Sequence, residues 1–217
     1  MSSRRFPGKV LAPLHGRPVV WHVIQAMKAG GFADEEITVL TSSEPSDDPI
    51  AAYAETLRIG VFRGSLHDVI GRFAAAAKIY PCEWILRATA DSPCYEPTLI
   101  RFVRQATEST QAGFVTTTHR RTLPVGMNLE AFRLESLFSA LEKPDLSVED
   151  REHVTRSLHS GAGGVTTCSI ELAGNDFSGV GVSIDHPSDL ASLEGGGHAS
   201  ILSSIPWDKL IIRTVER

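Results

Sequence analysis

Cysteine is scarce in this sequence, and the pattern of the few that occur excludes two classes of protein. The three cysteines, Cys82, Cys94 and Cys168, are far apart and odd in number. A disulfide framework usually has an even number of cysteines, and a zinc site of the CxxC type needs closely spaced pairs. We therefore expect reduced thiols in a cytoplasmic protein.

Long hydrophobic runs and a basic excess are also missing. No apolar stretch approaches the roughly 20 residues of a membrane span, and the N-terminus lacks the hydrophobic core of a signal peptide. The formal net charge is −5 at pH 7, with lysines and arginines scattered along the chain. Neither a membrane nor a nucleic acid is an expected partner, so an anionic ligand must be held by local positive charge.

The 217 residues are enough to bury a core, and their first half alternates short apolar segments with segments of helical spacing. Strands are expected at Ile37–Thr41, Val61–Phe62, Trp84–Ala88 and Gly113–Thr117. Helices are expected at Pro18–Ala29, Pro49–Leu57, Asp68–Lys78 and Pro97–Thr107. This alternation predicts a doubly wound α/β domain with a mainly parallel, Rossmann-like sheet.

The rhythm loosens after residue 120, where we expect a small antiparallel excursion. The elements expected there are strands at Leu129–Arg133, Val165–Leu172 and Val180–Ile184, and helices at Glu135–Leu141 and Glu149–His159. The domain is expected to cover residues 1–192. A tail at 193–217 follows, because Gly195, Gly196 and Gly197 break the helix that begins at Pro187. Its last stretch, Trp207–Val215, fits either a strand or a helix.

The segment Arg5-Phe6-Pro7-Gly8-Lys9 has the composition of a phosphate-binding loop. Gly8 permits close approach of the backbone to phosphate, Arg5 offers a planar fork, and Lys9 offers a point charge. A basic surface loop is the competing interpretation. No G-x-x-x-x-G-K-[ST] motif occurs, so phosphate would be held in another way than in a Walker loop.

Two aspartates each follow an apolar segment that is predicted to be a strand. Asp91 comes after Trp84–Ala88, and Asp185 comes after Val180–Ile184. Ligands of open α/β sheets bind at the carboxyl ends of strands, and Mg²⁺ in nucleotide sites is held by one or two carboxylates together with phosphates and waters. The pair could supply that number, although Asp91 could instead cap a turn and Asp185 a helix.

Two further polar clusters leave their roles open. Arg151–Thr155 contains His153, which fits a general base but also a solvated helix face. The basic cluster His119-Arg120-Arg121 could meet an acidic ligand or could be a solvated loop.

Taken together, the motifs resemble the cytidylyltransferases of the spore-coat polysaccharide type, relatives of the CMP-sialic acid and CMP-KDO synthetases. The resemblance covers about Ser3 to Leu190. It rests on Arg5–Leu11, Asp47–Ile50, Val61–Ser65, Asp68-Val69, Arg87–Pro93, Arg121–Gly126, Arg151–Thr155 and Asp185–Leu190, which occur in the family's order and spacing.

The resemblance implies a nucleotide-diphospho-sugar transferase-like fold and Mg²⁺-dependent transfer of CMP from CTP to an acylneuraminate-like sugar acid. Pyrophosphate would leave, and the product would serve cell-surface polysaccharide or spore-coat biosynthesis. The region of about 120–165 would form the acceptor or homodimer contact. The implied roles are nucleotide binding by Arg5, Gly8, Lys9 and Arg87, catalysis by Lys9, Asp91 and Asp185, metal binding by Asp91 and Asp185, and acceptor binding by Arg121, Glu130 and His153.

The sequence also departs from the family pattern. Family members begin with an apolar strand, whereas here Met1 stands almost at the loop, so we expect a missing first strand and two open sheet edges. Where the family pattern has two glycines and an acid, this sequence has Ser2, Ala90 and Asn128. The alternatives are therefore a catalytically impaired nucleotide-binding relative, or a nucleotide-sugar glycosyltransferase. The charge of the Arg5–Lys9 loop argues against the latter, because a diphosphate sugar needs less positive charge.

Overall fold

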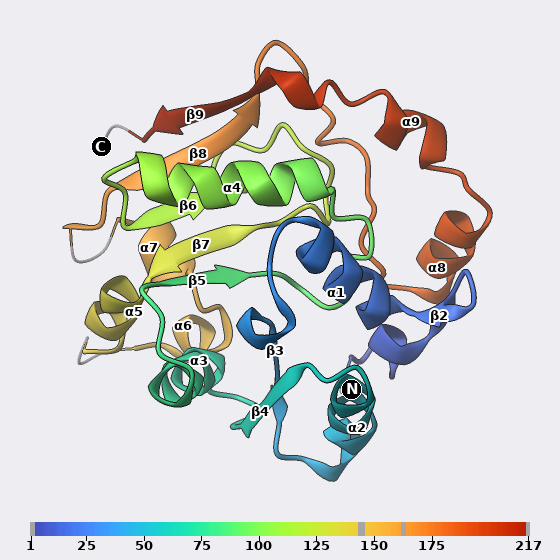
Figure 1. Ribbon diagram of the computed structural model, residues 1–217, viewed down its shortest axis with the longest axis horizontal. Helices are drawn as coiled ribbons and strands as arrows, with labels where there is room; N and C mark the ends of the chain where they lie inside the picture. Colours follow the sequence, from blue (N-terminus) through green and yellow to red (C-terminus); the bar gives the residue numbers. More distant parts are fainter. Residues whose placement is uncertain (1–2, 143–145, 162–163, 216–217) are drawn as a thin grey trace.

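Two separate β-sheets form the centre of the protein (Figure 1). The computed structural model describes residues 3–142, 146–161 and 164–215. Strands β3 (Thr38–Ser42) and β4 (Gly60–Gly64) form a parallel pair. The second sheet has the strand order β5-β7-β6-β8-β9, with β5 at Trp84–Arg87, β6 at Phe114–Thr116, β7 at Glu130–Arg133, β8 at Thr167–Leu172 and β9 at Leu210–Thr214. A short hairpin, β1 (Pro13–Leu14) with β2 (Arg17–Pro18), precedes both sheets.

Helices cover both faces of the five-stranded sheet. The α-helices are α1 (Val19–Ala29), α2 (Asp48–Thr56), α3 (Val69–Ile79), α4 (Pro97–Ser109), α5 (Leu134–Leu141), α6 (Val148–Glu152), α7 (Arg156–His159), α8 (Pro187–Glu194) and α9 (Ala199–Ser203). On β6, Val115 belongs to the apolar cluster of α1 and α4, whereas its neighbour Phe114 belongs to the cluster of α3, α5 and α7. Successive side chains of a strand point to opposite faces, so these clusters lie on opposite sides of the sheet.

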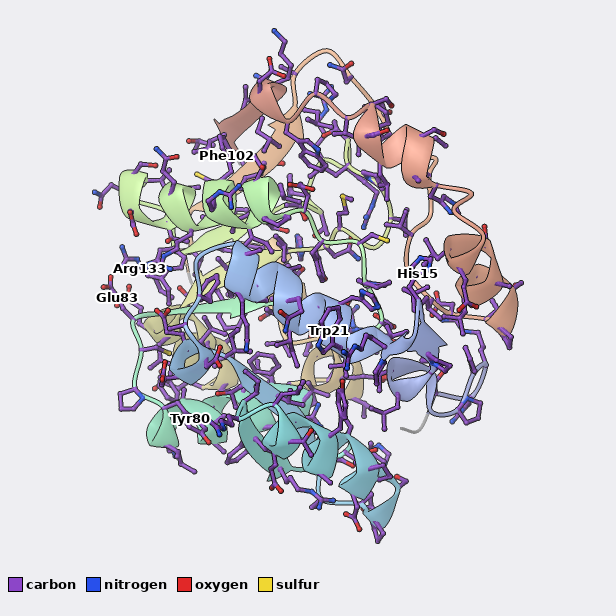
Figure 2. All side chains as sticks on the ribbon, turned by 45° about the vertical axis from the view of Figure 1, so that its right-hand side comes forward. His15, Trp21, Tyr80, Glu83, Phe102 and Arg133 are labelled. Carbon is purple, nitrogen blue, oxygen red and sulfur yellow. The ribbon has the colours of Figure 1, made fainter. Side chains whose placement is uncertain are left out.

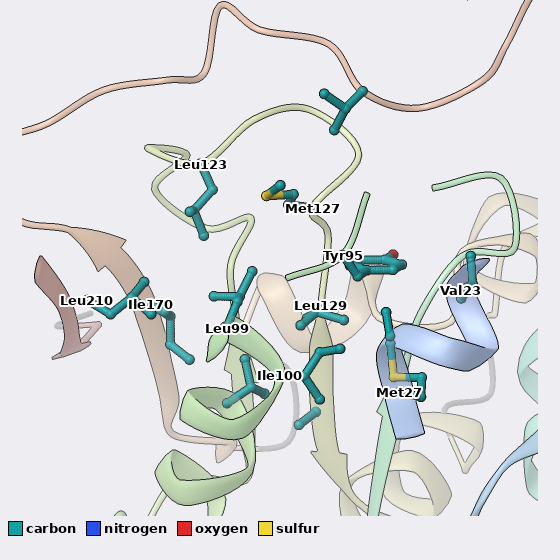
Figure 3. Packing of buried hydrophobic residues seen from close by; sticks show 14 of the residues in the cluster. Val23, Met27, Tyr95, Leu99, Ile100, Leu123, Met127, Leu129, Ile170 and Leu210 are labelled. Carbon is teal, nitrogen blue, oxygen red and sulfur yellow. The ribbon is translucent and has the colours of Figure 1, made fainter. Parts of the chain in front are cut away.

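The larger cluster is the main core of the molecule (Figure 3). It combines Leu99 and Ile100 of α4, Met27 of α1 and Ile170 of β8 with Leu129 just before β7. At the other end of the same strands, away from the candidate site described below, Glu83 and Arg133 lie side by side and form an ion pair (Figure 2). Within the described ranges, no helix combines the length and the hydropathy that a bilayer crossing requires.

The prediction of a mainly parallel sheet was wrong. In the five-stranded sheet only the β6–β8 pair is parallel, among the strands that the structure describes. The antiparallel excursion predicted after residue 120 explains the difference, because its strand β7 does not stand apart. It inserts between β5 and β6 and runs antiparallel to both.

Three further expectations change with the structure. The strand expected at Val180–Ile184 is absent from the described elements, since the segment makes one isolated bridge, Val125 with Gly181. The helix expected at Glu149–His159 is divided into α6 and α7, because the backbone of His153 leaves the helical region with φ −106° and ψ 87°. The tail ends in a strand, β9, which pairs with β8.

In the described part of the chain both sheets have open strand edges, among them one edge of β3 and one edge of β5. There β3 pairs only with β4, and β5 pairs only with β7. The β3–β4 pair lies on the β5 side of the larger sheet (Figure 1). Ala90 packs against the small cluster around β3, and Asn128 lies just before β7, whereas Ser2 is outside the described residues.

Candidate functional site

The Arg5–Lys9 loop is a tight turn that its glycine makes possible. Gly8 has a φ of 75°, in the left-handed region that glycine adopts without a steric penalty. The chain then enters a short 3₁₀ helix, Lys9–Leu11, and Leu11 donates its backbone N–H to the carbonyl of Gly8 at 2.9 Å. Phe6 packs against the main core. The loop is therefore anchored by Phe6, and Lys9 is directed by the turn.

Asp91 lies in the loop that connects β5 with α4, at the carboxyl end of β5 as predicted from the sequence. Tyr95 organises this loop: its hydroxyl accepts the backbone N–H of Thr89 at 3.0 Å and donates to the backbone carbonyl of Asn128 at 2.9 Å. The carbonyl of Asp91 itself accepts the N–H of Ile184 at 2.9 Å. This last bond brings the two aspartate loops together.

Asp185 begins the turn into α8 but is not its cap. The N-cap is His186, and the carboxylate of Asp189, in the first turn of the helix, accepts the N–H groups of Asp185 at 2.9 Å and His186 at 2.7 Å. Burial raises the pKa of Asp189, but these backbone hydrogen bonds outweigh burial and lower the pKa below its ordinary value. The side chain of Asp185 is left to meet other partners.

Those partners are Lys9 and Arg5. Lys9 Nζ lies 2.5 Å from Asp91 Oδ2 and 3.0 Å from Asp185 Oδ1, and Arg5 Nη2 lies 2.7 Å from the same Asp185 oxygen. Burial lowers the pKa of Lys9, but the hydrogen bonds and charges of Asp91 and Asp185 outweigh it, so that the pKa is raised and the ammonium stays charged. We call these four residues the charge cluster.

The donor set of the charge cluster fits a divalent cation that also contacts substrate. Asp91 and Asp185 offer carboxylate oxygens, the ligands Mg²⁺ prefers, and their side chains are 25% and 35% exposed. No group of three or more metal-binding side chains occurs in the described ranges. Two carboxylates cannot complete an octahedral shell, so phosphate oxygens and water would have to supply the remaining ligands.

A second polar site adjoins the end of β5. A cavity of about 320 Å³ is lined by Arg87, Glu130, His153, Thr155, Arg156 and His159. At its base, Arg87 Nη1 lies 2.5 Å from Glu130 Oε2, and His159 Nε2 donates to Glu130 Oε1 at 3.0 Å. Arg87 and Glu130 face each other in the register of β5 and β7. We call this site the acceptor cavity, after the role that the family resemblance predicts for Glu130 and His153.

Glu130 is the buried anion of the acceptor cavity, with a side chain that is 6% exposed. Burial raises its pKa, but the hydrogen bond from His159 and the charge of Arg87 reverse the effect and lower it to about 2. The ring of His159 is held in turn by Phe114, edge to face at 4.9 Å, and by His119, stacked at 6.3 Å. Glu130 is therefore ionised and fixed.

The structure brings some of the predicted acceptor residues together and leaves one apart. Glu130 and His153 line the same cavity, whereas Arg121 is not among its lining residues. Arg121 donates from Nη1 to Oδ1 of Asn128 at 2.7 Å. Arg87, expected at the nucleotide, contacts Glu130 instead of a member of the charge cluster.

Sequence reasoning overlooked His159 and Arg156. Both follow the break between α6 and α7, and the sequence predicts one continuous helix there. A buried carboxylate on a strand requires cationic partners, so the position of Glu130 could have prompted a search for them. No sequence signal indicates that these particular residues meet it.

Comparison with known proteins relates the chain to a protein family. The sequence profile described as cytidylyltransferase matches residues 1–170. The spore coat polysaccharide biosynthesis protein SpsF of Bacillus subtilis is 27% identical over 158 residues, which are 71% of this chain and 65% of SpsF. The chain thus spans less than two thirds of the length of SpsF.

Solved structures show the same fold. A cytidylyltransferase from Leptospira borgpetersenii matches with a TM-score of 0.82 and 27% identity, over 89% of this chain and 81% of that one. CMP:2-keto-3-deoxy-manno-octonic acid synthetase, in a structure complexed with CTP, matches in fold with a TM-score of 0.62 and 14% identity, over 92% and 95% of the two chains. The family resemblance of the motifs is confirmed by the profile and these relatives, and the chain belongs to the cytidylyltransferase family as a homologue of SpsF.

Proposed function

We propose that this protein is a Mg²⁺-dependent cytidylyltransferase that transfers CMP from CTP to a sugar acid and releases pyrophosphate. The observation that carries the proposal is the convergence of Lys9 and Arg5 with Asp91 and Asp185 at distances of 2.5 to 3.0 Å. A triphosphate needs cations, and its metal needs carboxylates; the charge cluster holds both. The CTP in the structure of the related synthetase supports the choice of nucleotide.

The chemistry is a displacement at the α-phosphorus of CTP. A hydroxyl oxygen of the acceptor forms a bond to phosphorus and loses its proton to water, while the bond to the bridging oxygen breaks and that oxygen leaves with pyrophosphate. Arg5 and Lys9 would orient the phosphates and offset their charge, with the backbone turned close to them at Gly8. Mg²⁺ held by Asp91 and Asp185 would supply further charge neutralisation. Nucleotidyl transfer depends on such positioning and electrostatics, so no covalent nucleophile is required.

The acceptor cavity supports a small anionic acceptor with hydroxyl groups. Its volume of about 320 Å³ falls within the range of small-molecule sites. Arg87, Arg156 and the two histidines offer donors and positive charge for a carboxylate, and ionised Glu130 offers an acceptor for a hydroxyl. Arg121 would contact the acceptor from the adjoining loop. The role of SpsF that its name states supports a place in polysaccharide biosynthesis.

The open edges of β3 and β5 support a finer proposal about the fold. A first strand of the kind the family resemblance implies would lie between them and join the two sheets into one doubly wound sheet. Fusing the apolar first strand of a family member to the N-terminus should then raise the melting temperature above that of the 217-residue protein. An extension that leaves the melting temperature unchanged would contradict this placement.

Pyrophosphate release tests the activity. The protein should release pyrophosphate from CTP and Mg²⁺ with a sugar acid such as 3-deoxy-manno-octulosonate or N-acetylneuraminate. Asp91→Asn should lower kcat by about 10³-fold, because the lost charge acts on the transferring phosphate. The matched control is Asp34→Asn, which breaks the ion pair of Asp34 with Lys28, outside the cluster. Full turnover by the Asp91 variant would show that the metal assignment is wrong.

A second function is a nucleotide-binding relative without turnover. It is favoured by Asn128, which stands where the family has an acid and is already engaged by Arg121 at 2.7 Å. Calorimetry that finds CTP binding, together with no pyrophosphate release over the acceptor panel, would support it. Release with any acceptor would exclude it.

A further inference from the structure

Lys9 stands where a divalent cation would have to bind. Its ammonium contacts one oxygen of Asp91 and one of Asp185, and its side chain is only 12% exposed. Arg5 takes part from the solvent side, with a side chain that is 58% exposed. Two cationic and two anionic side chains therefore balance each other, and the charge cluster is neutral by itself.

This balance opposes a metal ion that arrives alone. A divalent cation on Asp91 and Asp185 would displace Lys9 from both carboxylates and leave its positive charge nearby, largely buried and without its partners. Such repulsion is strong where water is partly excluded. A triphosphate changes the balance, because its oxygens give the displaced ammonium new anionic partners.

We propose that Lys9 is an exchangeable counter-ion that makes binding of the divalent cation depend on binding of the triphosphate. Without nucleotide, Lys9 occupies the carboxylates; with nucleotide, it moves to the phosphates, and the carboxylates become free for the metal. The inference rests on the proposed function, since it assumes that the charge cluster receives a metal nucleotide. By linkage, the nucleotide also gains affinity from the metal by the same factor.

Titration of Mn²⁺ without nucleotide, followed by the electron paramagnetic resonance signal of the free ion, tests the counter-ion role. Lys9→Met should bind Mn²⁺ at least about tenfold more tightly than the wild-type protein, because the competing charge is gone. Lys9→Arg keeps the charge and should retain the weak binding of the wild type. Lys28→Met removes a lysine outside the charge cluster, whose partner is Asp34, and should also behave as the wild type.

The double variant Lys9→Met/Asp91→Asn checks that the increase in Mn²⁺ affinity arises at the charge cluster, because it should lose that increase. Circular dichroism of each variant confirms folding, and if Lys9→Met does not fold, Lys9→Gln replaces it. Equal Mn²⁺ affinity in the folded neutral variant and the wild type would overturn the proposal, as would tight binding by Lys9→Arg.

Titration of Mn²⁺ in the presence of CTP distinguishes failure of the counter-ion role of Lys9 from failure of the proposed function. With CTP present, wild-type Mn²⁺ affinity should rise at least about tenfold, whereas in Lys9→Met the rise should be smaller. If CTP does not bind at all, the proposed function fails, while the Mn²⁺ comparison without nucleotide still decides whether Lys9 competes for the carboxylates. A CTP-induced rise as large in Lys9→Met as in the wild type would overturn the coupling.

Discussion

The charge cluster and the acceptor cavity hold their ionised groups in different ways. Asp91 and Asp185 lie on loops, are 25% and 35% exposed, and share a flexible lysine. Glu130 lies on a strand, is 6% exposed, and meets Arg87 across the register of β5 and β7. The first arrangement can exchange partners at little cost, whereas the second cannot, because a buried charge without a partner is expensive.

This difference matches the proposed tasks of the two regions. Side chains that must release each other to bind a metal nucleotide belong on loops whose backbone is held in place. The N–H of Ile184 holds the backbone of Asp91 in this way. A group that must present one fixed carboxylate to an acceptor belongs on a sheet. Variants that affect one region and spare the other test this difference.

Among variants outside the charge cluster, the largest effect is expected at Gly126, whose loop packs against the segment that leads to Asp185. Gly126 has a φ of 109°, and a Cβ there would lie 2.6 Å from the backbone nitrogen of Ser183. Gly126→Ala should therefore cost about 3 kcal/mol of stability. It should also lower kcat by about 10²-fold, because the displaced segment carries Asp185. Thermal unfolding and pyrophosphate release measure the two effects.

Gly181→Ala is the matched control on the facing segment. A Cβ there would meet no atom within 4 Å, and its φ is not positive, so stability and kcat should stay near wild type. If Gly126→Ala lost stability but kept full turnover, Asp185 would not depend on this support.

Glu130→Gln tests the fixed region and should have a smaller effect. Loss of the carboxylate charge weakens two hydrogen bonds to charged or polarised donors, which should cost about 2 kcal/mol at neutral pH. The KM for the acceptor should rise while the KM for CTP stays unchanged. Glu171→Gln is the control, because Glu171 is equally buried and pairs with Arg213 at 3.2 Å outside the cavity. A rise in CTP KM with Glu130→Gln would show that the two regions are not separate.

The pH dependence of stability should carry the signature of Glu130. Its pKa is lowered from 4.5 to about 2 in the folded protein, so its stabilisation is complete above pH 4.5 and is lost as pH falls toward 2. The stability difference between wild type and Glu130→Gln should therefore shrink across this window. A difference that stays constant there, in urea unfolding at each pH, would contradict the lowered pKa.

The two regions also differ in how far sequence could predict them. The charge cluster was predictable, because its members follow periodic segments or stand beside a glycine, and these signals are local. The predicted role of Lys9 at phosphate did not include its contact with both aspartates, since a contact 176 residues apart in sequence leaves no local mark.

The acceptor cavity was predictable only in part, because tertiary context decides it. Glu130 meets Arg87 through an antiparallel insertion of β7 beside β5, which the expected parallel sheet did not contain. His159 reaches Glu130 because the predicted helix breaks at His153, whose residue type does not require a break. The segment before Asp185 has the composition of a strand, yet it makes one isolated bridge, between Gly181 and Val125. The chain turns away directly after Val125, at Gly126, which has a positive φ.

The smallest effect is expected at Tyr95, which joins the two regions. Its ring lies in the core near Leu129 and Val23 (Figure 3), and its hydroxyl connects the Asp91 loop at Thr89 with Asn128, two residues before Glu130. Tyr95→Phe leaves a backbone donor and a backbone acceptor without this partner, which should cost about 1 kcal/mol of stability. A looser connection between the Asp91 loop and β7 should also lower kcat about fivefold, with the KM for CTP unchanged.

Tyr80→Phe is the control, because that tyrosine is 38% exposed and makes one long hydrogen bond of 3.4 Å to the carbonyl of Val61. It should change neither stability nor kinetics. Thermal unfolding and kcat together distinguish a role of Tyr95 in core stability from a role in connecting the two regions. If Tyr95→Phe loses stability while kcat stays at the wild-type value, the hydroxyl serves the core alone, and the charge cluster and the acceptor cavity keep their relative positions without it.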